Sequence, residues 1–339
     1  MGGKSCGNVF MYGERGKLVS KIVCNKFLKN STSLVTPYEQ TRAGFVALAL
    51  EKNRLGTPYI EEAKILKVEA SKAKTPVSLL KLKNIKAALL TAAGVSEKAS
   101  SHLTDEDKTE AIRGLIENFL DPSGKDFVEE LVYRFLLTKG DSLGGSMRNL
   151  AGKLGEKKFI RALISSLSVR GREFGWRDSK TNKWIKGDDQ VVDIEARANA
   201  ISWQTERQSR VLMFNIVVPI VTKNVDLSLL NCFEKDIDSA VKSAYLYPER
   251  YIALGELKGG VDPAGADEHW KTANSAIERI RKAFAAKKLK PYTFFIGAAI
   301  EKSMAKEIFS QLRKGTLSCA GNLTVDKHLI EICGWLIDL

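Results

Sequence analysis

The chain has 339 residues, which is enough for a sizeable hydrophobic core and, at roughly 150 residues per domain, for two domains. Hydrophobic residues make up 44% of the chain and charged residues 27%, which argues against an intrinsically disordered protein. The formal net charge of +13 favours a polyanionic partner such as nucleic acid, because a basic surface attracts phosphate backbones.

The cysteines and the apolar runs indicate where the protein works. The five cysteines are odd in number, form no C-x-x-C pair and match no zinc spacing, so we expect free thiols in a reducing cytosol. No apolar run approaches the roughly 18 residues that a membrane span needs, and no signal-peptide core is present. We therefore expect a cytoplasmic protein without a membrane partner. The cysteines are Cys6, Cys24, Cys232, Cys319 and Cys333.

Residues 1–36 are basic and weakly periodic, and we treat them as a leader without an assigned role. The next segment has helical periodicity and predicts an all-helical domain over residues 37–145. Thr104-Asp105-Glu106-Asp107 looks like a capping box, and the glycine-rich run 140–145 predicts a turn at the domain boundary. The expected helices are Tyr38–Lys52, Pro58–Ala73, one opened by Pro76, one from Thr104 to Leu120, and Lys125–Leu137.

Residues 146–339 have a different pattern, which predicts an α/β fold with a mixed sheet and helices on its faces. A polar and aromatic stretch at Trp176–Asp189 predicts a loop or hairpin. The expected strands are Val211–Val221, Val225–Leu230, Tyr251–Leu257 and Tyr292–Ile300. The expected helices are Ser146–Leu167, Ala266–Lys287, Glu301–Lys314 and Val325–Ile337.

The most specific chemical feature stands at the end of an apolar strand, in Gly255-Glu256-Leu257-Lys258-Gly259-Gly260. Side chains alternate along a strand, so Glu256 and Lys258 point to one face. Asp226 begins another strand, and the three side chains converge if the strands are neighbours. Two carboxylates are suitable Mg²⁺ ligands, and Lys258 can hold an attacking water and stabilise negative charge at phosphorus.

By itself a Glu-x-Lys triplet is a weak signal, because three others occur in this chain, at Glu62, Glu106 and Glu156. These three lie in polar, helical settings that are typical of solvated faces. Only Glu256 ends an apolar strand. The simpler alternative is a surface ion pair at a strand end.

Asp226 and the Glu256-Leu257-Lys258 triplet resemble the PD-(D/E)xK nuclease superfamily, although Val225 stands where that motif usually has proline. The run from Gly255 to Asn274 is similar to the AvaI/BsoBI family of type II restriction endonucleases. Stretches at residues 42–45, 57–61, 140–145, 223–226 and 295–301 resemble the same family. The resemblance extends over roughly residues 38 to 339.

This resemblance implies a restriction-endonuclease-like catalytic domain over residues 146–339 and a helical domain that embraces DNA over residues 37–145. It also implies a homodimer that encircles double-stranded DNA and cuts C/YCGRG with Mg²⁺, leaving 5′ overhangs. Such an enzyme implies a cognate DNA methyltransferase that protects the host site. A dimer suits a palindromic site because protein and DNA share a two-fold axis.

The resemblance also assigns roles to His269, Asp262 and Lys98. His269 becomes a candidate general base, since its unperturbed pKa of about 6.5 lets it take a proton near neutrality. Asp262 is a candidate acceptor for cytosine N4, and Lys98 a candidate donor to purine N7, which both A and G present. The alternatives stay open: a helix-face histidine, an N-cap aspartate before Pro263, and a solvated lysine.

Two other functions compete with a restriction enzyme. A repair or recombination nuclease of the same superfamily would share the metal site without tight sequence specificity. A DNA-binding protein on a decayed nuclease fold would bind without cleaving, but the intact Asp226, Glu256 and Lys258 argue against it.

Overall fold

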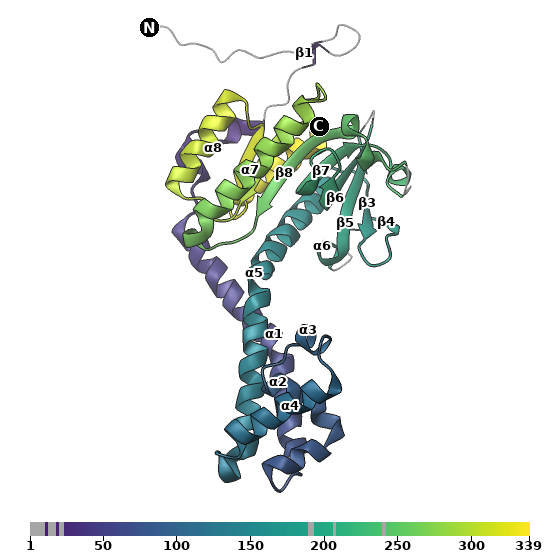
Figure 1. Ribbon diagram of the computed structural model, residues 1–339. Coiled ribbons are helices and arrows are strands. Elements are labelled where there is room, and N and C mark those ends of the chain that lie inside the picture. The colour runs from purple at the N-terminus through teal and green to yellow at the C-terminus, as the bar shows by residue number, and fades with distance from the viewer. Residues whose placement is uncertain (1–10, 13–17, 20–23, 189–192, 206–207, 239–241) are drawn as a thin grey trace. The chain divides into compact units, whose positions relative to one another are not determined.

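The computed structural model describes residues 11–12, 18–19, 24–188, 193–205, 208–238 and 242–339 (Figure 1). Most of the predicted leader, with Cys6, lies outside the described residues. The chain divides into two compact units: residues 45–150 form one, and the chain up to Gly44 together with residues 151–339 forms the other. None of the described helices is long and apolar enough to cross a membrane.

The unit of residues 45–150 is helical, as the periodicity predicts. Its core is built from fully buried leucines and isoleucines, among them Leu79, Ile112 and Leu120. The predicted capping box at Thr104 is confirmed: Thr104 and Asp107 exchange side chain to backbone hydrogen bonds of 3.2 and 2.8 Å. The helices that build the unit are α1 (Tyr38–Ala70), α2 (Lys86–Ala92), α3 (Glu97–Ser100), α4 (Asp105–Leu115) and α5 (Phe127–Val169), the first and last of which continue into the other unit.

Two predicted breaks in the helices are wrong. Pro58 does not open a second helix but lies inside α1, and residues 140–145 form no turn but lie inside α5. Proline and glycine weaken a helix interior locally, by about 3 and about 1 kcal/mol respectively relative to alanine. Packing overrides these preferences. In α1, Ala63, Leu66 and Ala70 after the proline are buried in the core of the helical unit. In α5, Leu131 is buried in that core and Leu163 in the core of the other unit.

The other unit is built on an eight-stranded mixed sheet with the strand order β10-β9-β8-β7-β6-β5-β3-β4. The β10–β9 and β9–β8 pairs are parallel and the remaining pairs antiparallel. The predicted α/β fold with a mixed sheet is confirmed. The strands are β3 (Phe174–Asp178), β4 (Trp184–Lys186), β5 (Ala198–Gln204), β6 (Ser209–Val218), β7 (Lys223–Asn231), β8 (Tyr251–Lys258), β9 (Tyr292–Gly297) and β10 (Cys319–Asn322).

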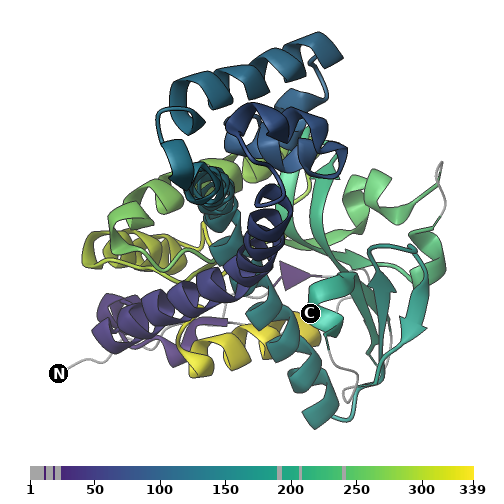
Figure 2. The same cartoon turned by 90° about the horizontal axis from the view of Figure 1, so that it is seen from below.

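Helices cover both faces of this sheet. The end of α5 and the helix α9 (Asp326–Asp338) pack on one face, where Leu163 and Leu336 join a cluster with Leu257. The helices α7 (Ala266–Ala285) and α8 (Lys302–Lys314) contact each other on the other side, as Figures 1 and 2 show. The strands predicted from apolar runs and these three C-terminal helices are confirmed, whereas β5 and β10 were not predicted.

The last part of the predicted leader belongs to the core of this unit. Leu28 and Leu34 are buried against residues of α7 and α8. Thr36 Oγ1 donates a hydrogen bond of 2.8 Å to Ala298 O and accepts one of 2.8 Å from Ile300 N–H. Residues 24–36 therefore pack against α7 and α8 and hydrogen-bond to the segment that follows β9.

The prediction that all cysteines are free is wrong for two of them. The structure joins Cys24 and Cys319 in a disulfide, with Cα atoms 5.3 Å apart across 295 residues of sequence. Cys232 and Cys333 are buried free thiols. Sequence spacing carries no signal for a bond between residues so far apart.

Candidate active site

The structure brings Asp226, Glu256 and Lys258 together. The antiparallel pairing of Leu227 with Gly255 places Asp226 of β7 opposite Glu256 of β8. Lys258 Nζ lies 2.8 Å from Glu256 Oε2 and 3.0 Å from Asp226 Oδ2. The same Asp226 oxygen accepts a hydrogen bond of 2.9 Å from the Leu257 N–H. One ammonium thus bridges two carboxylates from neighbouring strands.

The protonation of this cluster departs from that of free side chains. Burial, reinforced by the charge of Asp226, raises the pKa of Glu256 from 4.5 to about 7. Burial alone would lower the pKa of Lys258, but the charges of Glu256 and Asp226 outweigh it, so the pKa of Lys258 is raised. The ammonium stays charged near neutrality, and Glu256 is poised to take or release a proton there.

The donor set fits a divalent cation of the hard, oxygen-preferring kind. Glu256 is only 4% exposed, and its Oε1 atom is buried without a hydrogen-bond partner. A buried unpaired carboxylate oxygen is costly unless a ligand compensates for it. In the part of the chain that the structure describes, no three His, Cys, Asp or Glu side chains form a metal group. A Mg²⁺ ion nevertheless commonly uses only one or two carboxylates and takes its other ligands from water and phosphate.

The turn after β8 depends on two glycines that make close contacts. A Cβ on Gly259 would lie 2.5 Å from the Ala151 carbonyl oxygen of α5, and a Cβ on Gly260 would lie 2.5 Å from His269 Cε1. Gly155 of α5 meets Gly259 in the same way, with its Cβ position 2.6 Å from the Gly259 Cα. The glycines therefore let α5 and the His269 ring approach the turn that follows Lys258.

His269 lies in the first turn of α7, with its ring over Gly260. Its Nδ1 atom is buried without a hydrogen-bond partner. The helix-face interpretation expected a hydrogen-bond partner for this ring, but Nδ1 has none among the described residues. The ring is therefore held by packing rather than by a hydrogen bond at this nitrogen.

The structure places the two predicted DNA-contacting residues in different units. Asp262 is exposed, and its Oδ1 accepts a hydrogen bond of 2.9 Å from the Ala264 N–H, so it caps the turn Pro263–Gly265. Lys98 is exposed on the short helix α3 of the helical unit. The interpretation of Asp262 as an N-cap is therefore confirmed. Only Oδ1 caps the turn, so the second oxygen of this exposed carboxylate is available to accept another hydrogen bond.

Two further polar residues next to Asp226 were not identified from the sequence. Asn215 of β6 donates from Nδ2 to Glu156 Oε2 of α5 at 2.6 Å. Burial raises the pKa of Glu156, the Asn215 hydrogen bond opposes that rise, and the charge of Asp226 adds to it. Glu156 is one of the Glu-x-Lys glutamates that the sequence analysis assigned to a solvated face, and it is instead half-buried. Only the fold brings it towards Asp226.

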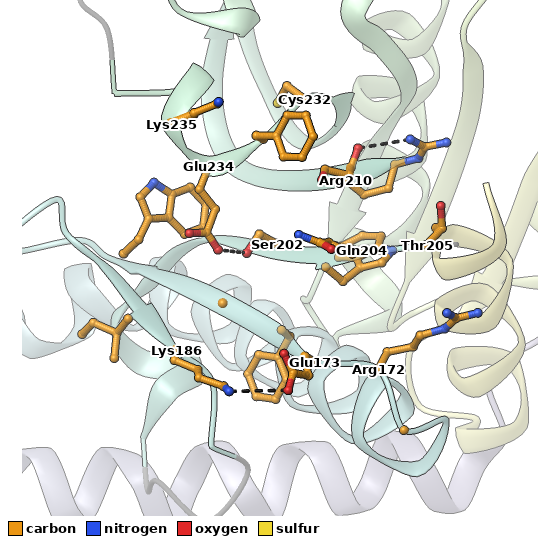
Figure 3. Close-up of a pocket in the computed structure, with 18 residues that line it drawn as sticks. Arg172, Glu173, Lys186, Ser202, Gln204, Thr205, Arg210, Cys232, Glu234 and Lys235 are labelled. Atoms are coloured by element: carbon orange, nitrogen blue, oxygen red, sulfur yellow. Dashed lines mark hydrogen bonds and ion pairs between the residues drawn. The ribbon is translucent and has the colours of Figure 1, made fainter. Parts of the chain in front are cut away.

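A cavity of about 770 Å³ lies elsewhere on the sheet, at the opposite end of β7 (Figure 3). Cys232, which lines it, follows the last residue of β7, whereas Asp226 stands near the first. Two pairs of polar side chains in its lining bond to each other, Ser202 with Glu234 and Lys186 with Glu173, as Figure 3 shows. This cavity contains none of the predicted catalytic residues, and the candidate active site stays at the Asp226 end of β7.

Comparison with known proteins decides the family. The sequence profile described as "Restriction endonuclease BsobI" matches residues 24–339. The chain belongs to the BsobI restriction endonuclease family. It is 53% identical over 312 residues to the type II restriction enzyme AvaI of Nostoc sp. and to that of Anabaena variabilis, covering 92% of this chain and 98% of each relative. It is 52% identical over 315 residues to the type II restriction enzyme BsoBI of Geobacillus stearothermophilus, covering 92% of this chain and 97% of that relative.

The BsobI family places the chain among the type II site-specific deoxyribonucleases. The chain is therefore a hydrolase of a restriction system that acts on double-stranded DNA, and enzymes of this type generally use divalent metal ions. The resemblance drawn from residues 255–274 is thus confirmed at the level of the family, and the repair-nuclease alternative is not favoured.

Proposed function

We propose that this restriction endonuclease cleaves C/YCGRG with Mg²⁺ and leaves 5′ overhangs. The observation that carries the chemistry is the convergence of Asp226, Glu256 and Lys258 at one edge of the sheet. The likeness of residues 255–274 to the family motif, together with the identity to AvaI and BsoBI, supports the choice of site.

In this proposal Asp226 and Glu256 would hold the metal ion, and Glu256 Oε1, which has no hydrogen-bond partner, would be free to bind it. When bound, Mg²⁺ would neutralise charge on the scissile phosphate and lower the pKa of a water. Lys258, charged at neutral pH, orients the attacking water and stabilises the negative charge that develops at phosphorus. Its two carboxylate contacts fix the ammonium for that task.

His269 takes the proton from the attacking water in this mechanism. A general base needs a free lone pair, and neutral histidine has one. The ring packs over Gly260, only two residues after Lys258, and its Nδ1 lacks a hydrogen-bond partner. A position beside the catalytic turn and an unengaged nitrogen both support this role.

Lys98 and Asp262 contact bases in the same proposal. The exposed Lys98 ammonium donates to purine N7, which A and G share and which therefore tolerates a degenerate position. Asp262 accepts from cytosine N4 with the carboxylate oxygen that does not cap Ala264. The helical unit then embraces the DNA and the α/β unit cuts it.

A homodimer acting in the cytoplasm completes the proposal. A palindromic site is matched by two copies related by a two-fold axis. A cognate DNA methyltransferase protects the host copies of the site, without a requirement to bind this chain.

Digestion of a fully sequenced plasmid in Mg²⁺, followed by sequencing of the fragment ends, tests the function. Cuts only at C/YCGRG are expected. Discrete cuts at another sequence would reject the proposed site, and a smear of fragments would reject tight specificity. Asp226→Ala serves as the matched variant: it should abolish cleavage while cognate DNA still binds in Ca²⁺. Strong residual cleavage by this variant would reject the assigned metal ligands.

A further inference from the structure

The strand pairing beside Asp226 is interrupted. Strands β6 and β7 pair regularly from Arg210 with Asn231 to Phe214 with Leu227, and again from Ile216 with Val225 onward. Asn215, which would face Asp226, is left out of this register. Its φ is 53°, in the left-handed region that few residues other than glycine adopt. Irregular strand positions of this kind often re-aim a neighbouring side chain at an active site.

The side chain of Glu156 in α5 hydrogen-bonds to Asn215 at this irregular position of β6. Asn215 Nδ2 donates to Glu156 Oε2 at 2.6 Å. Glu156 follows Gly155, the α5 residue that rests directly on Gly259. The helix therefore touches the catalytic turn through Gly155 and holds the strand opposite Asp226 through Glu156.

We propose that Glu156 and Asn215 are positioning residues that set the orientation of the Asp226 carboxylate. The inference rests on the proposed function of Asp226. Asp226 keeps one oxygen on the Leu257 N–H and on Lys258 Nζ, at 2.9 and 3.0 Å, and the same carboxylate would have to hold the metal ion. The Glu156–Asn215 hydrogen bond holds the backbone bend at Asn215, and this bend in turn fixes the start of β7.

A direct metal ligand is the alternative role for Glu156, and the geometry favours positioning. The Oε2 atom of Glu156 is already engaged by the Asn215 amide. No group of three acidic, histidine or cysteine side chains suited to a metal occurs within the described ranges, so Glu156 does not form one with Asp226 and Glu256.

The test compares variants that separate the hydrogen bond from the charge. Glu156→Gln keeps an oxygen that can accept from Asn215, whereas Glu156→Ala does not. Asn215→Gly keeps the left-handed backbone and removes the amide. We expect Glu156→Ala and Asn215→Gly each to lower the single-turnover cleavage rate about 10- to 100-fold and to raise the half-saturating Mg²⁺ concentration, because small misplacements of reacting groups are costly. Glu156→Gln should retain most of the wild-type rate.

The double variant Glu156→Ala/Asn215→Gly should be no slower than either single variant, because both remove the same contact. Glu195→Ala is the matched control: Glu195 pairs with Arg161 of α5, outside the site, so its loss should change thermal stability without changing the rate or its Mg²⁺ dependence. A rate loss in Glu156→Gln as large as in Glu156→Ala would overturn positioning in favour of a charge or ligand role. A wild-type rate in Asn215→Gly would also overturn it.

Measuring the wild-type protein in parallel distinguishes a failure of the proposed function from a failure of the positioning role. If it shows no Mg²⁺-dependent cleavage, the proposed function fails and the positioning role fails with it. If wild type cleaves and Asp226→Ala does not, a failure of the Glu156 and Asn215 variants to respond rejects the positioning role alone.

Discussion

At the scale of single residues, the burial of Glu256 makes the free energy of unfolding depend on pH. Its pKa is about 7 instead of 4.5, chiefly because it is buried. Between these pH values the unfolded chain has released this proton and the folded protein still holds it. The folded state then binds more protons, so the free energy of unfolding of the metal-free protein falls as pH rises from about 4.5 to about 7.

Glu256→Gln should remove this contribution, because an amide does not ionise. We expect the variant to be more stable than wild type at pH 8 in EDTA, by about 1–3 kcal/mol, and to lose part of the decline between pH 5 and pH 8. Urea unfolding at both pH values measures the difference. Glu331→Gln, on an exposed position of α9, is the control and should follow wild type. An unchanged pH dependence in Glu256→Gln would show that Glu256 ionises normally.

His269 gives a prediction about the chemical step. General-base catalysis typically contributes about 10²- to 10⁴-fold, so His269→Ala should lower the single-turnover rate within that range. The pH profile of the single-turnover rate should therefore differ in shape between wild type and His269→Ala. His102→Ala, at an exposed position of the helical unit, is the control. Identical pH profiles for His269→Ala and wild type would exclude the general-base role.

At the scale of elements, α5 contains glycines of two kinds. A Cβ on Gly144 or Gly145 would meet nothing within 4 Å, and neither residue has a positive φ. A Cβ on Gly155 would lie 2.6 Å from the Gly259 Cα. The first two glycines have open space around the Cβ position, and the third is a contact between the helix and the turn that follows β8.

Replacing a glycine of α5 by alanine should therefore stabilise the protein at two positions and destabilise it at a third. Gly144→Ala and Gly145→Ala should each raise the free energy of unfolding by about 0.5–1 kcal/mol, since alanine restricts the unfolded chain and favours the helix. Gly155→Ala should lower the free energy of unfolding and slow cleavage, because the backbone at Gly259 must move to make room for the new Cβ. Denaturant unfolding and single-turnover cleavage measure both effects. Equal effects at Gly144 and Gly155 would show that α5 does not rest on the turn.

These elements also show what sequence could predict. The apolar runs of β6 and β8 are typical of buried strands, and the alternation along β8 places Glu256 and Lys258 on one face. The local pattern failed where packing decides. Pro58 lies inside α1, which is buried in the core of the helical unit, and the glycines of 140–145 lie inside α5, which is buried in a core at each end. The short strand β10, Cys-Ala-Gly-Asn, has too few large side chains to reveal a strand.

Part of the candidate site could likewise be predicted from the sequence, and part of it could not. Glu256 and Lys258 could be predicted because they stand at the end of an apolar strand, and Asp226 because it stands near the start of another. Glu156 and Asn215 could not, because their meeting depends on where a helix crosses a sheet edge and on an irregular strand position. The disulfide between Cys24 and Cys319 is likewise a product of the fold alone.

At the scale of the whole molecule, the net charge of +13 should govern how DNA binding responds to salt. Each phosphate neutralised by lysine or arginine releases condensed counterions, so the logarithm of the association constant falls linearly with the logarithm of salt concentration. In Ca²⁺, which permits binding without cleavage, we expect affinity for non-cognate duplex to fall about 10³-fold or more between 50 and 200 mM salt, corresponding to about six or more phosphate contacts.

Cognate duplex should keep a larger share of its affinity across the same range, because the hydrogen bonds to base edges that we propose for Lys98 and Asp262 would not depend on counterion release. Lys98→Ala should therefore narrow the gap between cognate and non-cognate DNA, most clearly at high salt. Lys180→Ala, an exposed lysine of the β3–β4 hairpin, provides the comparison, since loss of one charge outside the base-reading set should weaken both duplexes alike or neither. If Lys98→Ala weakens both duplexes equally, Lys98 contacts the backbone rather than a base, and the degenerate position is read by another residue.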